Sequence, residues 1–422
     1  MTVLVINRLS LASRRYRDWI DSARRVVLVT TESSVTPIPA SRADQLAGYD
    51  DVLIVPDSIP ESQLESVGAE LAKHHRVEKV IALSEADLLV AARIRAASGI
   101  DGPTERELLL FRDKGVMKSR LLAEGVPVLP SVIARDVSDI QGFAHDFGYP
   151  IVVKPTRGSG SVGVTVIDSS LALDVVRVKG SIDFITDPHN GLVEPYIEHE
   201  LFHVDGLVRS GEVVYSWVSS QGHSSCLGMR LGRNLRSAIL DPDDERAAGL
   251  RALAVRALHA LGVAATSLFH AEIFSTPEGY FINEIAARGG GGRIGDMIRA
   301  ASGVYLPEEY VRAETASHPR EDSDRTLKSH SAGLLLVPRR SGVVQRVPTA
   351  SCNETLIDLR VDVRPGDRLY TAQNSTDAAV SAIVRHVDRE HVEWALDSVE
   401  ELIDREFILV TSSGTEQEDT SR

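Results

Sequence analysis

The feature that most constrains this chain is an apolar, strand-like run that delivers a lysine into a glycine-rich loop. The run is Val152–Pro155, which contains Lys154, and the loop is Thr156–Val164. Three glycines and two serines form the centre of the loop: Gly158, Ser159, Gly160, Ser161 and Gly163. Without a Cβ the backbone can bend sharply and approach a bulky anion, and consecutive amides form a concave donor surface for phosphate oxygens. The pattern therefore predicts a strand–loop–strand unit that binds a phosphate-bearing anion.

This unit differs from the P-loop of many nucleotide-binding proteins. Its lysine precedes the glycines, and no Gly-Lys-Ser/Thr sequence opens a helix after them. The alternative is a surface β-hairpin turn beside a solvated lysine. The acidic motifs later in the chain favour the anion site.

Length and composition exclude several classes of protein. A chain of 422 residues is too long for one ordinary core, and 43% hydrophobic with 25% charged residues is typical of soluble globular domains. A net charge of -14 disfavours nucleic acid and anionic membranes as partners, so a bound nucleotide would need a local cluster of Lys, Arg and metal. Cys226 and Cys352 provide neither a disulfide framework nor a zinc site.

The compartment can also be predicted. The amino terminus lacks the basic region and cleavage site of a signal peptide, and no apolar run approaches the roughly 18 residues of a membrane helix. Together with the low cysteine content, this predicts a cytoplasmic protein.

Residues 1–105 form the first predicted domain, in which short apolar strands alternate with amphipathic helices. This alternation predicts a parallel sheet covered by helices. No GxGxxG follows the first strand, so nothing supports a dinucleotide site there. The predicted strands are Val3–Ile6, Val26–Val29, Val52–Val55 and Val80–Leu83.

The second predicted domain, residues 106–320, begins with a helix and becomes rich in strands. The helix is expected over Thr104–Glu124, because Asp101-Gly102-Pro103 precedes it and Gly125 follows it. Further on, Leu201–Val208 and Glu212–Val218 are expected to pair as a hairpin.

A third predicted domain covers residues 321–422. The charged segment Ser317–Arg325 is the expected linker to it. Short strands follow, a closing helix is expected over Asp377–Val387, and the polar tail from Thr411 is expected to be frayed.

Four further polar motifs accompany the glycine loop in a fixed order. They are Arg112-Asp113-Lys114 before it, and Glu194–Ile197 with Glu200 and Asp205-Gly206, His270-Ala271-Glu272, and Asn283–Gly292 after it. In this order the motifs resemble the ATP-grasp superfamily, and within it the carboxylate–amine ligases related to bacterial L-amino-acid ligases and D-alanine–D-alanine ligase. The resemblance covers roughly residues 1–320 and the remainder more loosely.

The resemblance implies an α/β and α+β fold. A Rossmann-like pre-ATP-grasp domain would precede a two-subdomain ATP-grasp fold, with a mobile lid at about residues 151–195, and an α+β lid domain would end the chain. Lys114 and Lys154, from different subdomains, could converge on one polyphosphate. The family's equivalent lysines hold the α- and β-phosphates, although either residue could also be a solvated surface lysine.

The resemblance places the segment Glu194–Ile197 under the adenine of ATP. Pro195 cannot donate a backbone hydrogen bond, which leaves Ile197, next to Tyr196, as the expected amide contact. Glu200 could accept hydrogen bonds from the ribose hydroxyls. The alternative is that Glu194 and Glu200 lie on an exposed strand edge.

Glu272 and Glu284 lie near the ends of neighbouring predicted strands. Two carboxylates on one face would repel each other unless a cation lies between them, and Mg²⁺ takes few protein carboxylates and completes its shell with phosphate and water. These two residues are therefore the predicted metal ligands. The alternative is an ion pair with Arg288 or Arg293.

Arg288 precedes four glycines and is the predicted catalytic residue. Its guanidinium could grip the oxygens of an acyl phosphate in bidentate fashion, and a structural salt bridge is the alternative. Ala286 stands where the family more commonly has asparagine, so the metal would keep an extra water or Asn283 would compensate. The number of bound metal ions therefore stays open.

The polar stretch Ser219–Arg236 is expected near the substrate pocket. His223, Arg230 and Arg233 could recognise a substrate carboxylate, or they could be solvated loop residues. The segment His199–His203 matches the zinc-protease pattern HExxH, but that motif requires a helix. On the strand predicted here, the two histidines would lie about 13 Å apart, too far for one metal.

The predicted function is an ATP-dependent carboxylate–amine ligase, which forms an amide through an acyl phosphate and releases ADP and phosphate. ATP and Mg²⁺ are the implied cofactors, with Mn²⁺ as an alternative metal. The substrates implied are amino acids or short peptides, and homo-oligomerisation stays open. The alternatives are a thiol or carrier protein as acceptor, a small-molecule phosphotransferase, or a regulatory nucleotide-binding module.

Overall fold

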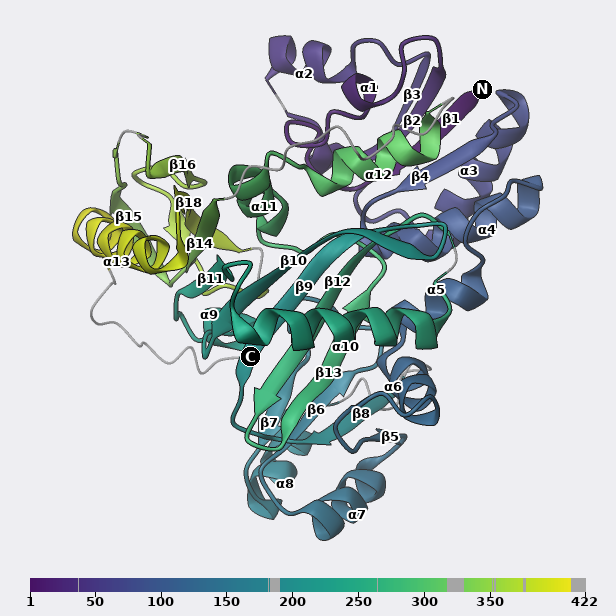
Figure 1. Cartoon of the computed structure of the whole chain (residues 1–422). Coiled ribbons are helices and arrows are strands. Elements are labelled where there is room, and N and C mark those ends of the chain that lie inside the picture. Colours follow the sequence, from purple (N-terminus) through teal and green to yellow (C-terminus); the bar gives the residue numbers. More distant parts are fainter. Residues whose placement is uncertain are drawn as a thin grey trace, which may run out of the picture.

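The computed structural model describes most of the 422 residues (Figure 1). Described are residues 1–36, 38–180, 182, 190–263, 265–316, 330–350, 352, 354–374 and 377–410. The predicted linker, residues 317–325, and the predicted tail from residue 411 lie outside them. No helix in the described part is long and apolar enough to cross a membrane, and the cytoplasmic location stays a prediction.

The N-terminal domain is the parallel sheet that the alternating pattern predicts. Its strand order is β3-β2-β1-β4, and β1 and β2 are almost entirely buried. The strands are β1 (Thr2–Asn7), β2 (Arg25–Thr31), β3 (Asp51–Val55) and β4 (Lys79–Ala82). The helices are α1 (Tyr16–Trp19), α2 (Pro39–Leu46), α3 (Glu61–His74) and α4 (Leu88–Ser98), with short 3₁₀ turns at Glu32–Ser34 and Glu85–Asp87.

Two helices, not one, connect this domain to the rest of the chain. The single helix predicted over residues 104–124 is wrong, because the chain extends at Asp113 between α5 (Glu105–Arg112) and α6 (Lys114–Ala123). The Asp113 carboxylate caps α6 by accepting from the amides of Gly115 and Val116. It also accepts a hydrogen bond from Arg157 Nε at 3.0 Å. This break makes Lys114 the first residue of a new helix.

A small antiparallel sheet carries the glycine loop and forms the lower lobe in Figure 1. Its order is β5-β8-β6-β7, and β6 and β7 form the predicted strand–loop–strand unit. The strands are β5 (Val132–Ala134), β6 (Ile151–Pro155), β7 (Thr165–Ile167) and β8 (Gly191–Pro195), and the helices are α7 (Val137–Phe147) and α8 (Ser170–Val178). Apolar residues between the sheet and these helices form a separate core.

The central element is an eight-stranded sheet with the order β13-β12-β9-β10-β11-β14-β18-β16. Strands from the last hundred residues extend one side of it. On the other side, α10 lies across β9, β10 and β13 (Figure 1). The strands are β9 (Glu200–Arg209), β10 (Glu212–Gly222), β11 (Leu235–Ile239), β12 (Ser267–Thr276), β13 (Gly279–Ala286), β14 (Ser331–Pro338), β16 (Leu356–Val361) and β18 (Ala378–His386). The hairpin β9–β10 confirms the predicted pairing.

The closing helix predicted over residues 377–387 is wrong, because β18 occupies this segment. Most of the strand is buried, and it pairs with β14 and β16. A strand buried on both faces is apolar without alternation, and a continuous apolar run has no period that distinguishes a strand from a helix.

The remaining elements are helices that contact strands of the central sheet, together with one small sheet. The helices are α9 (Cys226–Arg230), α10 (Glu245–Leu261), α11 (Ile294–Ser302), α12 (Leu306–Thr315) and α13 (Arg389–Glu406), and a small sheet contains β15 (Gly342–Arg346), β17 (Arg368–Leu369) and β19 (Ile408–Val410). One apolar cluster contains residues of β1, α12 and β14.

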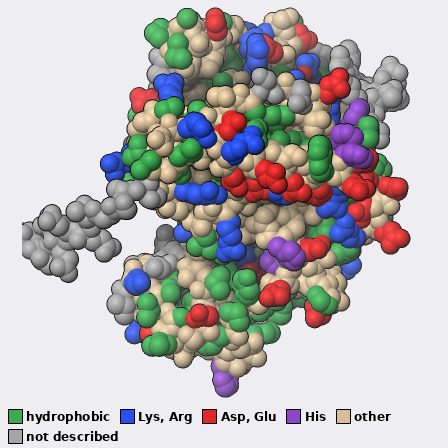
Figure 2. Space-filling view, turned by 90° about the vertical axis from the view of Figure 1, so that its left-hand side faces the viewer, with side chains coloured by type: hydrophobic (Ala, Val, Ile, Leu, Met, Phe, Trp, Pro, Cys, Tyr) green, Lys and Arg blue, Asp and Glu red, His purple; other side chains and the backbone are tan. Residues whose placement is uncertain are grey.

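Acidic side chains gather across the middle of the face in Figure 2, in keeping with the net charge of -14.

Replacing Gly206 by alanine is expected to destabilise the protein strongly. A Cβ at this position in β9 would overlap the Tyr215 carbonyl oxygen and lie 2.6 Å from two ring atoms of Phe269. Overpacking of a tight core costs about 1–3 kcal/mol or more, which urea unfolding would measure. The control is Gly142→Ala in α7, where no atom lies within 4 Å and alanine is the better helix former. Equal stability of the two variants would contradict the prediction.

Candidate active site

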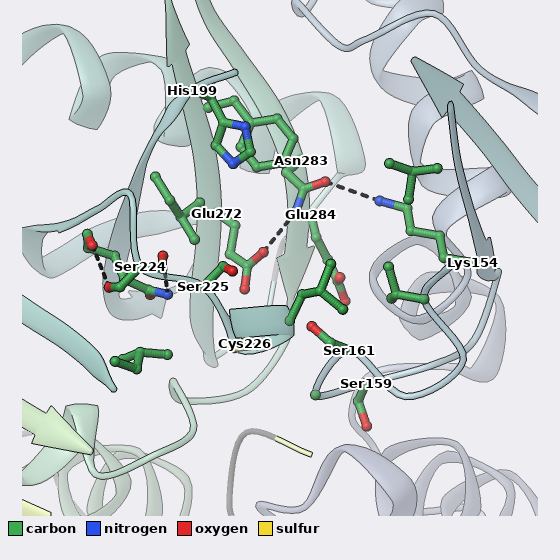
Figure 3. Close-up of a pocket in the computed structure, with 18 of the residues that line it drawn as sticks. Lys154, Ser159, Ser161, His199, Ser224, Ser225, Cys226, Glu272, Asn283 and Glu284 are labelled. Carbon is green, nitrogen blue, oxygen red and sulfur yellow. Dashed lines mark hydrogen bonds between the residues drawn. The ribbon is translucent and has the colours of Figure 1, made fainter. Parts of the chain in front are cut away.

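A cavity of about 580 Å³ opens between the glycine loop and the central sheet. In Figure 3, Lys154 and the loop serines lie on one side, Ser224–Cys226 on the other, and the glutamates between them. The predicted site residues that line the cavity are Lys114, Lys154, Gly158, Ser159, Gly160, Ser161, Glu194, Tyr196, Ile197, His223, Glu272, Glu284 and Arg288. The other predicted site residues, all described, do not line it: Gly163, Glu200, Arg230 and Arg233.

The glycine loop is held at two points. Gly160 has φ +59, a left-handed conformation that glycine adopts without strain. Lys114 Nζ donates to the Gly158 carbonyl at 2.7 Å, and Arg230 Nη1 donates to the Ser161 carbonyl at 2.8 Å. These contacts fix the loop next to the cavity.

Lys154 lies in a buried cluster with one glutamate and a second lysine. Its Nζ is 2.5 Å from Glu194 Oε2, and Lys118 Nζ pairs with Glu194 Oε1. Burial alone would raise the pKa of the Glu194 carboxyl, but the charges of Lys154 and Lys118 outweigh it and lower the pKa to about 2. Sequence reasoning missed Lys118, although it follows Lys114 by one helical turn.

The stability that this cluster provides should disappear in acid. The Glu194 pKa falls from an ordinary 4.5 to about 2 on folding, so the ion pairs stabilise the protein above about pH 4.5 and are lost as the pH falls toward about 2. Glu194→Gln should lower the free energy of unfolding near neutral pH by about 3–5 kcal/mol, because two lysines stay buried without their partner.

The same substitution should also flatten the dependence of unfolding free energy on pH in that acid range. Urea unfolding at a series of pH values would measure this slope. The matched control is Glu198→Gln, an exposed glutamate close by in the chain, which should keep the wild-type slope. An unchanged slope in Glu194→Gln would show that this carboxyl does not titrate as described.

Glu272 and Glu284 face each other across two strands. They are direct partners in the antiparallel register of β12 and β13, so their side chains lie on one face of the sheet. The register shifts immediately beside this pair, and Asn283 is the extra, unpaired residue. Because of this bulge, Asn283 lies in the cavity wall together with its neighbour Glu284.

Asn283 connects the lysine to the first glutamate. Its Oδ1 accepts from Lys154 Nζ at 3.1 Å, and its Nδ2 donates to Glu272 Oε2 at 2.8 Å (Figure 3). Glu284 Oε2 lies 3.2 Å from Lys114 Nζ. Two carboxylates that share a cavity wall form a hard oxygen donor set, which fits Mg²⁺.

A buried relay of polar groups lies behind Glu272. His270 Nε2 is 3.6 Å from Glu272 Oε1, and His270 Nδ1 is 2.9 Å from Asp205 Oδ1. His203 Nδ1 lies 2.5 Å from Asp205 Oδ2, and its Nε2 lies 2.7 Å from Ser237 Oγ. Asp205 and His270 stand in the predicted motifs, but the sequence did not show that they contact each other, His203 and Ser237, because these residues lie on three separate strands.

Opposite charges are neighbours along the relay. Burial alone would lower the pKa of His270, but the charge and hydrogen bond of Asp205 raise it to about 10. Burial alone would raise the pKa of the Glu272 carboxyl. The hydrogen bond and positive charge of His270 and the hydrogen bond from Asn283 lower this pKa to about 2. Glu272 is therefore ionised at neutral pH, as a metal ligand must be. His203 lies on strand β9, so the HExxH segment is not helical, as predicted.

Arg288 is held by the N-terminal domain. Its Nε donates to Glu85 Oε2 at 2.7 Å, and Arg112 Nη1 donates to Glu85 Oε1 at 3.1 Å. Burial would raise the pKa of the Glu85 carboxyl, but the two guanidinium charges lower it. Glu85 was missed, since no local pattern connects it with a residue 203 positions away.

Glu194, Tyr196 and Ile197 of the predicted adenine segment line the cavity, whereas Glu200 does not. Tyr196 is exposed, and its amide donates to the Pro150 carbonyl at 3.0 Å. The Ile197 carbonyl lies 2.9 Å from His199 Nδ1. Glu200 lies outside the cavity wall, 3.7 Å from Arg246 Nη1.

The three basic residues predicted near the substrate pocket lie in different surroundings. His223 is exposed and lines the cavity, with Nδ1 3.1 Å from the His199 carbonyl oxygen. Arg230 contacts the glycine loop, whereas Arg233 is exposed outside the cavity. Their substrate roles stay predictions.

Comparisons with known proteins find similarity in both sequence and fold. The family model of the carbamoyl-phosphate synthase L chain, ATP binding domain, matches residues 113–185. An L-arginine-specific L-amino acid ligase from Bacillus subtilis is 27% identical over 322 residues, which are 76% of this chain and 75% of that protein.

Solved structures match nearly the whole chain. The L-amino acid ligase from Bacillus licheniformis has a TM-score of 0.75 at 16% identity, and the match covers 97% of this chain and 99% of that one. The biotin carboxylase domain of the Hydrogenobacter thermophilus 2-oxoglutarate carboxylase, in complex with MgADP, has a TM-score of 0.71 at 18% identity, with coverages of 97% and 91%. By sequence and by fold, this chain is therefore similar to ATP-grasp ligases, and in particular to the bacterial L-amino-acid ligases.

Proposed function

We propose that the protein joins a carboxylate to an amine through an acyl phosphate, using ATP and releasing ADP and phosphate. One observation carries the proposal: Glu272 and Glu284 are partners in the strand register and share a cavity with Lys114, Lys154 and Arg288. Cationic groups for phosphate, carboxylates for a metal and an arginine for an acyl phosphate therefore surround one space.

Each group has a distinct role in this proposal. Lys114 and Lys154 would bind phosphate oxygens of ATP, and the glycine loop would cover them and exclude water. Glu272 and Glu284 would hold Mg²⁺, with Mn²⁺ as a substitute, and the bound metal would neutralise charge on the transferred phosphoryl group. Arg288 would grip the oxygens of the acyl phosphate while the amine attacks its acyl carbon.

The substrates are proposed to be amino acids or short peptides. The name of the Bacillus subtilis relative supports this class, as does the fold shared with the Bacillus licheniformis ligase. A thiol, a carrier protein or a phosphorylated small molecule as acceptor remains the alternative, since the same nucleotide chemistry would serve it.

The decisive experiment measures ADP release over pairs of amino acids, with N-acetyl amino acids, which have a carboxylate but no free amine, tested alone as the control. The proposal expects release only when a carboxylate and an amine are both available, together with a product that has the mass of a dipeptide. Stoichiometric ADP formation with a single phosphorylated product would instead indicate a phosphotransferase.

A further inference from the structure

The end of the cavity away from the lysines has apolar walls. In Figure 3, Ser224–Cys226 lie across the cavity from Lys154 and the glycine loop. The apolar residues lining this end come from α9, β11, β14 and the start of α11, namely Cys226, Leu227, Leu235, Leu334, Leu336 and Ile294. Leu235, Leu334, Leu336 and Ile294 belong to one core cluster, against which Cys226 packs. We call this set the apolar end.

The sheet register explains why the cavity wall is charged at one end and apolar at the other. Glu284 pairs with Glu272 and Glu272 pairs with His203, so all three share one face of the sheet. His203 reaches Ser237 on β11 by a hydrogen bond, and Ser237 pairs with Leu334 on β14. The same face therefore passes from carboxylates through a histidine and a serine to leucines.

The apolar end offers no partner for a charged group. Among the described lining residues from α9, β11, β14 and α11, none carries a formal charge. Arg293, next to α11, pairs with Asp296 and Asp358 and does not line the cavity. A guanidinium, ammonium or carboxylate placed against these leucines would lose its hydration without gaining an ion pair, which is strongly unfavourable.

We infer that the apolar end binds the side chain of one of the two amino acid substrates, and that this side chain is uncharged and apolar. The inference rests on the ligase activity proposed above. It names a substrate class, namely amino acids such as leucine, methionine or valine, and it excludes pairs in which both side chains are charged.

The first test compares substrate pairs with the wild-type protein. Pairs that contain leucine, methionine or valine should give a kcat/KM for ADP release about 10- to 200-fold above pairs drawn only from arginine, lysine and glutamate. A preference for the charged pairs would overturn the inference and leave the ligase activity intact. Absence of ADP release with every pair would instead contradict the ligase activity itself.

The second test changes the lining. Leu227, half-buried in α9, lines the apolar end, whereas Leu231 just after that helix is exposed outside the cavity. Leu227→Glu should lower kcat/KM for leucine by about tenfold or more and raise it for arginine, and Leu231→Glu should change neither. Leu235→Ala, which enlarges the pocket without a charge, should shift preference from leucine toward phenylalanine. Unchanged preferences in both Leu227→Glu and Leu235→Ala would overturn the inference.

Discussion

Glu284→Gln should abolish ADP release while nucleotide binding stays measurable. The substitution keeps the size of the side chain but removes the charge that faces Glu272 across the register of β12 and β13. A metal that neutralises phosphoryl charge contributes several kcal/mol to the transition state, so turnover should fall by about 10³-fold or more. Binding of a fluorescent nucleotide and ADP release, measured at several magnesium concentrations, would separate the two effects.

A control on the same hairpin tests whether the effect is local. Glu278 is exposed in the turn between β12 and β13 and does not line the cavity, so Glu278→Gln should retain wild-type turnover. Because Glu284 also lies 3.2 Å from Lys114 Nζ, the thermal midpoint of each variant must be compared. A folded Glu284→Gln protein with full activity would refute the metal assignment.

Local patterns in the sequence were sufficient for much of the fold. Alternation of strands and helices predicted the parallel N-terminal sheet, and the apolar run before the glycines predicted the β6–loop–β7 unit. The glutamates at 272 and 284 were expected on adjacent strands, and the register confirms this placement. Each of these features depends on residues close in sequence, where periodicity and turn chemistry are informative. The roles of the individual site residues stay predictions.

The features that the sequence did not predict depend on contacts between distant segments. The helix break at Asp113 is one, since the apolar pattern continues across it and its capping carboxylate also binds Arg157, 44 residues away. The bulge at Asn283 is another: it is defined by the pairing of β13 with β12, and the residues of β13 alone do not show which of them is left unpaired. Lys118 and Glu85 look like ordinary surface residues of helical segments until the fold buries them.

Arg288→Lys should have the second-largest effect on activity. Lysine keeps the charge but cannot make the paired, planar hydrogen bonds that a guanidinium offers to an acyl phosphate. Loss of one such donor typically lowers kcat by about 10²–10³-fold, and the KM for ATP should change much less because Lys114 and Lys154 are the residues proposed to bind the triphosphate. The matched control is Arg312→Lys, an arginine on α12 that pairs with Glu308 outside the cavity.

Glu85→Gln then tests how Arg288 is positioned. Glu85 shares its two oxygens between Arg288 and Arg112, so a neutral amide would weaken the hold on the guanidinium without removing it. Supporting residues of this kind typically contribute about 10- to 100-fold to activity. The decrease should appear in kcat, with the KM for ATP unchanged within about twofold, and Glu85→Asp should restore part of it. If kcat and KM moved together with the thermal midpoint, Glu85 would act on domain packing rather than on the arginine. A decrease in kcat alone would mean that the N-terminal domain orients the group that meets the acyl phosphate.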